Sequence, residues 1–179
     1  MFPQKAQAHP HVFVDASLNL AFDKTGLQYL DVVWDFDEMS SDLFIADLDT
    51  DGDGTLTKEE WEAQQTDIEG YLSEQNFFVH VVVNGQKLQL TKLAKFIAQV
   101  DSENNLSYTM RIPLSVIGTA DVEKMQIAIY DPSYYTDFYT ALDAVSVTGR
   151  NDISLSIDDA PELAFYQGQI IPTAVTFEF

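Results

Sequence analysis

Two stretches near the start of the chain alternate apolar and polar residues, and this alternation constrains the fold more than any other feature. Within residues 12–22 and again within 30–36, the even-numbered positions are apolar. A period of two is typical of strands that bury one face. A three-residue loop ending at Gly26 would pair Asp23 with Leu27 and keep even positions opposite even positions. The two stretches are therefore predicted to form a hairpin.

Short apolar runs continue through the rest of the chain. Asn84-Gly85 is a typical two-residue hairpin turn and should place Val81 opposite Leu88. Further runs predicted as strands occupy residues 96–100, 106–112, 125–130, 145–147, 153–157 and 175–179. Many short strands at this spacing favour a mainly β (α+β) fold, an antiparallel β-sandwich.

The period changes between the two hairpins. Ser40-Ser41 can cap a short helix that runs through Leu48, and Thr57 can cap a longer one. We therefore predict that residues 9–179 form one β-sandwich domain with an inserted helix-loop-helix at about residues 40–75.

The loop between these helices, residues 49–60, matches the EF-hand calcium pattern D-x-D-x-D-G-x-L-x-x-x-E. The predicted calcium ligands are the carboxylates of Asp49, Asp51, Asp53 and Glu60, the backbone carbonyl of Thr55, and a water held by Thr57. In another interpretation Thr57 and Glu60 form only a capping box. That interpretation leaves three alternating aspartates unexplained, because they repel one another without a cation. A lone loop favours a structural Ca²⁺ over a sensing one.

Composition narrows the functional classes. The formal net charge of −20 argues against nucleic-acid binding, which needs clustered basic residues, and makes cations the expected partners. The absence of cysteine excludes thiolate metal sites and cysteine nucleophiles. No apolar run approaches the roughly 20 residues of a membrane-spanning helix. No hydrolase, metalloprotease or phosphate-loop motif is present, so the protein is not expected to be an enzyme.

The first residues suggest export and a metal-binding amino terminus. Ala6-Gln7-Ala8 is a small-x-small stretch of the kind that signal peptidase cuts, so residues 1–8 are predicted to be the remnant of an export signal. Cleavage would free the amine of His9, and His11 follows on the same side of an extended segment. The hairpin register places His11 opposite Met39 and brings Asp37 nearby. Imidazole with carboxylate suits zinc, and also nickel, cobalt or copper, although a lone strand histidine is usually structural.

Several motifs resemble one known family. The start His9-Pro10-His11-Val12-Phe13-Val14-Asp15-Ala16 resembles the mature start of bacterial periplasmic proteins encoded beside nickel/cobalt-type permeases. That family, long labelled a domain of unknown function, includes the periplasmic component of Zev-type zinc uptake systems. Further matching stretches lie at residues 34–38, 47–61, 77–80, 111–114 and 130–135. The resemblance covers most of residues 9–142.

The resemblance implies a periplasmic divalent-metal-binding accessory of a zinc or nickel/cobalt transport system in a Gram-negative bacterium, with an inner-membrane permease as partner. His9, His11, His80 and Asp131 lie in the matching motifs, and with Asp37 they form the candidate transition-metal site. For Asp131, a turn that Asp-Pro nucleates is an equally good interpretation. The alternative function is an extracytoplasmic β-sandwich interaction module that calcium stabilises and that has no transition-metal role.

Overall fold

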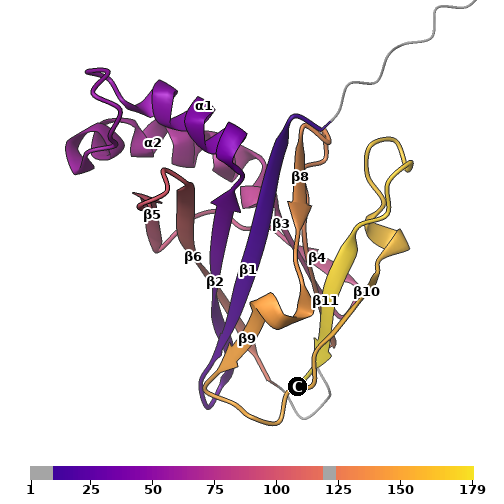
Figure 1. Ribbon diagram of the computed structural model, residues 1–179. Helices are drawn as coiled ribbons and strands as arrows, with labels where there is room; N and C mark the ends of the chain where they lie inside the picture. The colour runs from indigo at the N-terminus through magenta and orange to yellow at the C-terminus, as the bar shows by residue number, and fades with distance from the viewer. Residues whose placement is uncertain (1–9, 119–123) are drawn as a thin grey trace, which may run out of the picture.

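The computed structural model describes residues 10–118 and 124–179. Two β-sheets pack face to face, and two helices cover one end of the first sheet, away from the C-terminus (Figure 1). The prediction of a mainly β sandwich with an inserted helix-loop-helix is confirmed. The helices are α1 (Glu38–Leu48) and α2 (Lys58–Glu74), and short 3-10 helices occupy Asn76–Phe78, Leu142–Ala144 and Pro161–Leu163.

Eleven strands make up the two sheets within the described residues. They are β1 (Val12–Phe22), β2 (Gly26–Phe36), β3 (Val79–Val83), β4 (Gln86–Leu88), β5 (Lys95–Val100), β6 (Leu106–Ile117), β7 (Lys124–Ile129), β8 (Thr136–Tyr139), β9 (Val145–Thr148), β10 (Ser156–Asp159) and β11 (Thr173–Glu178). The first sheet has the order β5-β6-β2-β1-β8, with β9 also on β1, and the second has the order β10-β11-β7-β3-β4.

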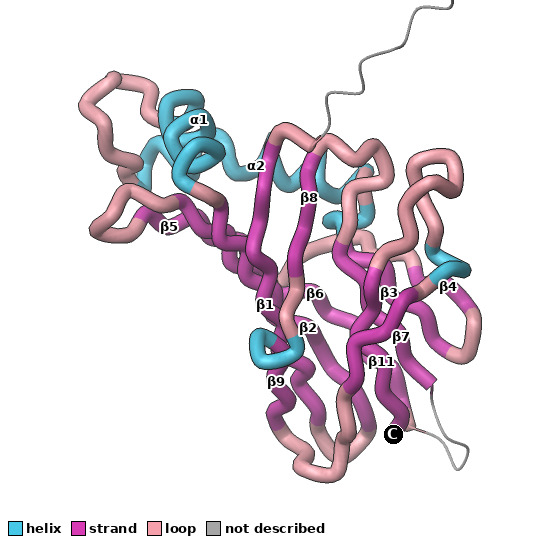
Figure 2. The backbone as a smooth tube through the Cα atoms, turned by 45° about the vertical axis from the view of Figure 1, so that its right-hand side comes forward, coloured by secondary structure: helices cyan, strands magenta, loops and turns pink. Residues whose placement is uncertain are grey.

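The first sheet is mixed, so the sandwich that was predicted as antiparallel also contains parallel pairs. β1 pairs antiparallel with β2, but β8 and β9 both run parallel to it. Figure 2 shows these two short strands following one another along the same side of β1. Two parallel strands need a long connection between them. Here the chain passes through β7 of the second sheet before it returns to the first sheet as β8.

The predicted hairpin register is confirmed along most of its length. Val14 lies opposite Phe36 and Leu20 opposite Leu30, so the apolar even positions of both strands face the core together. The prediction fails at the turn, where a bulge at Phe22 shifts that residue opposite Leu27, and at the other end, where the hairpin stops before His11 and Met39 could pair. In the second hairpin Val81 lies opposite Leu88, as predicted.

One apolar core joins the inner faces of the two sheets. Fully buried residues of both sheets meet in it, among them Leu18, Val32, Met110, Val81, Ile127 and Val175. Burying large aliphatic side chains of this kind stabilises the fold by about 1.5–3 kcal/mol each, before the cost of ordering the chain.

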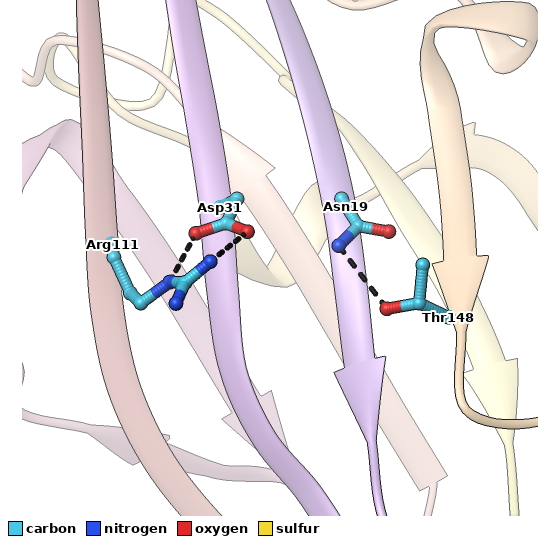
Figure 3. A network of polar contacts seen from close by, with 4 residues as sticks. All are labelled: Asn19, Asp31, Arg111 and Thr148. Atoms are coloured by element: carbon cyan, nitrogen blue, oxygen red, sulfur yellow. Dashed lines mark hydrogen bonds and ion pairs between the residues drawn. The ribbon is translucent and has the colours of Figure 1, made fainter.

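Polar side chains link the strands on the outer face of the first sheet. Arg111 of β6 donates two hydrogen bonds to the carboxylate of Asp31 on β2, at 2.7 and 2.8 Å (Figure 3). Its guanidinium also lies over the ring of Tyr29. On β1, Asn19 donates to Thr148 of β9 at 3.3 Å. Cross-strand contacts of this kind hold the register, so the motif around Arg111 has a structural explanation.

Helix α1 begins earlier than predicted. Its N-cap is Asp37, whose carboxylate accepts a hydrogen bond from the Ser40 amide, so the assignment of the cap to Ser40-Ser41 is wrong. Ser41 is fully buried; its hydroxyl accepts from the Leu106 amide at 2.9 Å and donates to the Phe36 carbonyl at 3.3 Å. Ser41 thus fixes the helix to the strand ends beneath it.

Replacing this anchor should destabilise the fold, while the neighbouring serine offers a matched control. Ser41→Ala leaves the Leu106 amide unpaired in the core and should cost about 1–3 kcal/mol. The equally buried Ser40 hydroxyl has no partner among the described residues, so Ser40→Ala removes no hydrogen bond and should cause no comparable loss of stability. Urea unfolding measures both. Equal losses would show that Ser41 does not anchor α1.

Candidate metal centre

The loop between α1 and α2 folds around the carboxylates of its first, third and fifth residues. Asp49 Oδ1 accepts hydrogen bonds from the amides of Gly52 and Asp53, at 2.8 and 3.2 Å. Its Oδ2 accepts one from the Gly54 amide at 2.7 Å, and Asp51 Oδ1 accepts one from the Asp53 amide at 3.1 Å. Gly52 and Gly54 have φ of 73° and 82°, a conformation that favours glycine.

These three carboxylates are close enough to share one ion. One oxygen each from Asp49, Asp51 and Asp53 lies within 4.8 Å of the others. Because Ca–O distances are about 2.3–2.6 Å, two oxygens on one Ca²⁺ lie no further apart than about 5 Å, so the arrangement fits. Within residues 10–118 and 124–179, no other three metal-ligating side chains come so close.

The electrostatics of the loop reflect this crowding. A hydrogen bond from the Asp53 amide lowers the pKa of Asp51, but the negative charge of Asp53, desolvation and the charge of Glu60 together raise that pKa above its usual value. Carboxylates that repel one another in this way are stabilised by a cation.

Glu60 joins the two ends of the loop. Its Oε1 accepts hydrogen bonds from the amide and hydroxyl of Thr50, at 2.6 and 3.1 Å, and its Oε2 accepts from the amide and hydroxyl of Thr57, at 2.9 and 2.8 Å. The bonds from Thr57 and then those from Thr50 lower the pKa of Glu60 to about 2. Glu60 is therefore ionised at neutral pH, as a calcium ligand must be.

The capping box of Thr57 and Glu60 is present together with the acidic loop, so the two interpretations of this segment do not exclude each other. The hydroxyl of Thr57 accepts a hydrogen bond from the Glu60 amide at 3.3 Å. Thr55 donates both its amide and its hydroxyl to Asp53 Oδ1, at 2.8 and 2.6 Å. The role of Thr50 in holding Glu60 was not predicted, because the EF-hand pattern leaves that position open.

The framework around the loop is packed on the sheet. Trp61 is buried against Phe96 of β5, with ring centroids 4.9 Å apart, and Leu56 packs on the core. Gln64 of α2 donates to the Leu48 carbonyl at 3.0 Å, which ties α2 to the end of α1. Both ends of the acidic loop are thus fixed before any ion binds.

The candidate transition-metal residues lie in several places. His11 donates its amide to the Tyr135 carbonyl at 2.9 Å, and its exposed ring lies 5.1 Å from that of Tyr135. The predicted pairing of His11 with Met39 is wrong, because Met39 already belongs to α1. Asp37 does lie opposite Phe13, to whose carbonyl it donates its amide at 3.2 Å, and its carboxylate caps α1.

His80 lies on β3 opposite Ala128, on the face of the second sheet that points away from the core. Its ring stacks on Tyr130 at 3.7 Å, and its Nε2 lies 3.1 Å from the Tyr130 carbonyl oxygen. Burial lowers the pKa of His80 to about 4, against the opposing effect of that hydrogen bond, and the charge of Lys87 lowers it further. The imidazole is therefore neutral at pH 7.

Asp131 organises a turn. Its Oδ1 accepts hydrogen bonds from the amide and hydroxyl of Ser133, at 2.8 and 2.7 Å, and its Oδ2 accepts from the amides of Tyr135 and Thr136, at 3.1 and 3.0 Å. The side chain is 5% exposed. These contacts are those of a turn, which was one of the two interpretations of Asp131.

Among the described residues, His11, His80, Asp37 and Asp131 do not supply three ligand atoms close to one another. His9 and the predicted export-signal remnant lie outside the described residues. The transition-metal site therefore stays a prediction.

The geometry described above defines the class of this protein: a β-sandwich that carries an acidic EF-hand-type loop. A family described as "Protein of unknown function (DUF1007)" matches residues 1–162, and the chain belongs to this family. It is also 24% identical over 132 residues to the "Uncharacterized 15.5 kDa protein in trpE 3'region" of Spirochaeta aurantia; the match covers 72% of this chain and 93% of that protein. Neither description names a metal, a permease or a compartment.

None of the helices in the described parts of the chain has the length and apolar character that a membrane span requires.

The pKa of His80 predicts a pH-dependent contribution to stability. An unfolded histidine takes up a proton near pH 6.5, whereas His80 in the folded protein does so near pH 4. Its contribution is therefore complete above pH 6.5 and is lost as the pH falls towards 4, by something on the order of 2–3 kcal/mol. His80→Gln should lose less stability between pH 7 and 4.5 than the wild type, measured by urea unfolding. His11→Gln, at an exposed position, is the control. If both variants show the same change of stability with pH, His80 is not the source of the pH dependence.

Proposed function

We propose that this protein is a periplasmic divalent-metal-binding accessory of a transition-metal transport system, and that a structural Ca²⁺ in the loop of residues 49–60 stiffens it. The observation that carries the calcium part is the close approach of the Asp49, Asp51 and Asp53 carboxylates, with an ionised Glu60 at the other end of the loop. Calcium would join these groups and remove their mutual repulsion.

Support for the transition-metal part comes from the amino-terminal motif. His11 follows directly on from His9-Pro10, and its ring is exposed at the start of β1. Zinc commonly takes three or four nitrogen, sulfur or oxygen ligands. In a chain without cysteine, an amine and two imidazoles at one end are the strongest available set. An inner-membrane permease for zinc, or for nickel or cobalt, is the proposed partner.

A calcium-stabilised interaction module is the second candidate, and one observation favours it. Asp131 and His80 both have structural roles in the described part of the chain, one within a turn and one within an aromatic stack. If the histidines at the amino terminus bind no metal, this second function is the better one.

The calcium site is tested by Glu60→Gln. Glutamine can still form the capping box, but it cannot bind Ca²⁺ through two carboxylate oxygens. At a hundredfold excess over its dissociation constant, Ca²⁺ should stabilise the wild type by about 2.7 kcal/mol, which raises the melting temperature by roughly 5–10 °C. The variant should lose most of this shift in calorimetry.

The control for this experiment is Glu59→Gln, which removes the neighbouring exposed carboxylate and should keep the full shift. A wild type whose melting temperature is the same in calcium and in chelator would contradict the calcium assignment. If Glu60→Gln keeps the calcium-dependent shift in melting temperature, the ion binds at another place in the protein.

The transition-metal site is tested by zinc titration of protein that begins at His9. The double variant His9→Ala, His11→Ala should bind zinc at least about tenfold more weakly, because two of at most four ligands are lost. Affinity should fall as the pH drops through about 6.5, where imidazoles take up protons. Equal affinity of the two proteins would eliminate the amino-terminal site and favour the interaction module. Protein that still carries residues 1–8 should bind more weakly, since its His9 amine is in a peptide bond.

A further inference from the structure

A cavity of about 500 Å³ lies between the two helices and the strand ends of the first sheet. Phe44 and Leu48 of α1 and Ile68 of α2 form one wall, while Trp34 of β2 and Tyr108 of β6 contribute to the opposite wall. Its volume is within the range of about 300–1,000 Å³ that is usual for small-molecule sites. The cavity is separate from the acidic calcium loop, although Leu48 directly precedes that loop.

The wall of the cavity is aromatic. Eight of the residues that line it are Phe, Tyr or Trp, and several of their rings contact one another, with Trp34 5.0 Å from Phe138 and Phe36 5.1 Å from Tyr108. Trp34 is 2% exposed, and its indole N–H has no hydrogen-bond partner among the described residues. A ligand without a hydrogen-bond acceptor leaves this donor as it is, so the aromatic faces are what such a ligand would contact.

The charges around the cavity have one sign. Asp47 and Asp131 line it, and no Lys, Arg or His does so among the described residues. Tyr71, which also lines the cavity, responds to this field: burial raises its pKa, and the negative charge of Asp131 raises it further. An anion would be repelled here, and a cation would be attracted.

We propose that this cavity binds a small organic cation with an apolar body, such as an aryl- or alkylammonium ion. Aromatic faces attract ammonium groups through their quadrupoles, and a carboxylate at the rim adds to that attraction. A bare metal ion fits less well, because Asp47 and Asp131 belong to no group of three close metal-ligating side chains among the described residues. This inference does not depend on the proposed transport function.

The experiment compares three probes on the calcium-saturated protein by NMR titration of its backbone amides. Phenyltrimethylammonium is the cation, tert-butylbenzene has the same shape without the charge, and benzenesulfonate is an anion. The cation should bind at least about fivefold more tightly than tert-butylbenzene, and its shifts should centre on α1, α2 and Trp34. A merely apolar cavity would rank tert-butylbenzene first. That ranking, or the absence of binding by the cation, would overturn the proposal.

Two sets of variants locate the site. Asp47→Asn should weaken cation binding by about twofold to fivefold, while Asp67→Asn, an exposed carboxylate of α2 that does not line the cavity, should leave it unchanged. Ile68→Trp should narrow the cavity and weaken binding of the cation. Equal effects of the two aspartate variants would show that the cation binds the acidic surface in general. If Ile68→Trp does not fold, the comparison of Asp47→Asn with Asp67→Asn still decides whether the cation binds in the cavity.

Discussion

The register between β1 and β2 is the constraint on which the rest of this structure depends. A slip of β1 by one residue against β2 would turn Asp15, which lies opposite Asp35, into the core and move the apolar positions of β1 out to solvent. The register also fixes where β2 ends, since the Asp37 amide still bonds to β1 before its carboxylate starts α1. Helix α1 therefore begins directly after the end of β2 at Phe36, and the acidic loop that follows α1 is placed by the same pairing.

Features with a local cause could be read from the sequence. The hairpins, the cap at Thr57 and the aspartate loop each depend on a few neighbouring residues, and the structure has all of them. The strand predicted at residues 145–147 is β9, but β8 was not predicted, and the parallel pairing of both with β1 could not be, because their partner lies more than 100 residues earlier in the chain. The cap at Asp37 was missed because Ser41, a good capping residue, is used in the core instead.

The candidate sites also differ in whether their residues are neighbours in the sequence. The loop of residues 49–60 is contiguous, so its ligand positions follow from spacing alone. The residues suggested for a transition metal come from four separate segments, and only the folded chain shows that His80 stacks on Tyr130 while Asp131 closes a turn. The aromatic cavity was not foreseen for the same reason, since its wall combines residues from two helices, several strands and a turn.

The division of one sheet edge into β8 and β9 has a consequence for how the molecule behaves in a crowded solution. A long exposed edge offers an unbroken row of amides and carbonyls to which another chain can add, and so it promotes aggregation. Here that edge is made of two strands of four residues, interrupted by the 3-10 helix Leu142–Ala144. Together with self-repulsion from a net charge of −20, the broken edge resists growth of one molecule's sheet onto another.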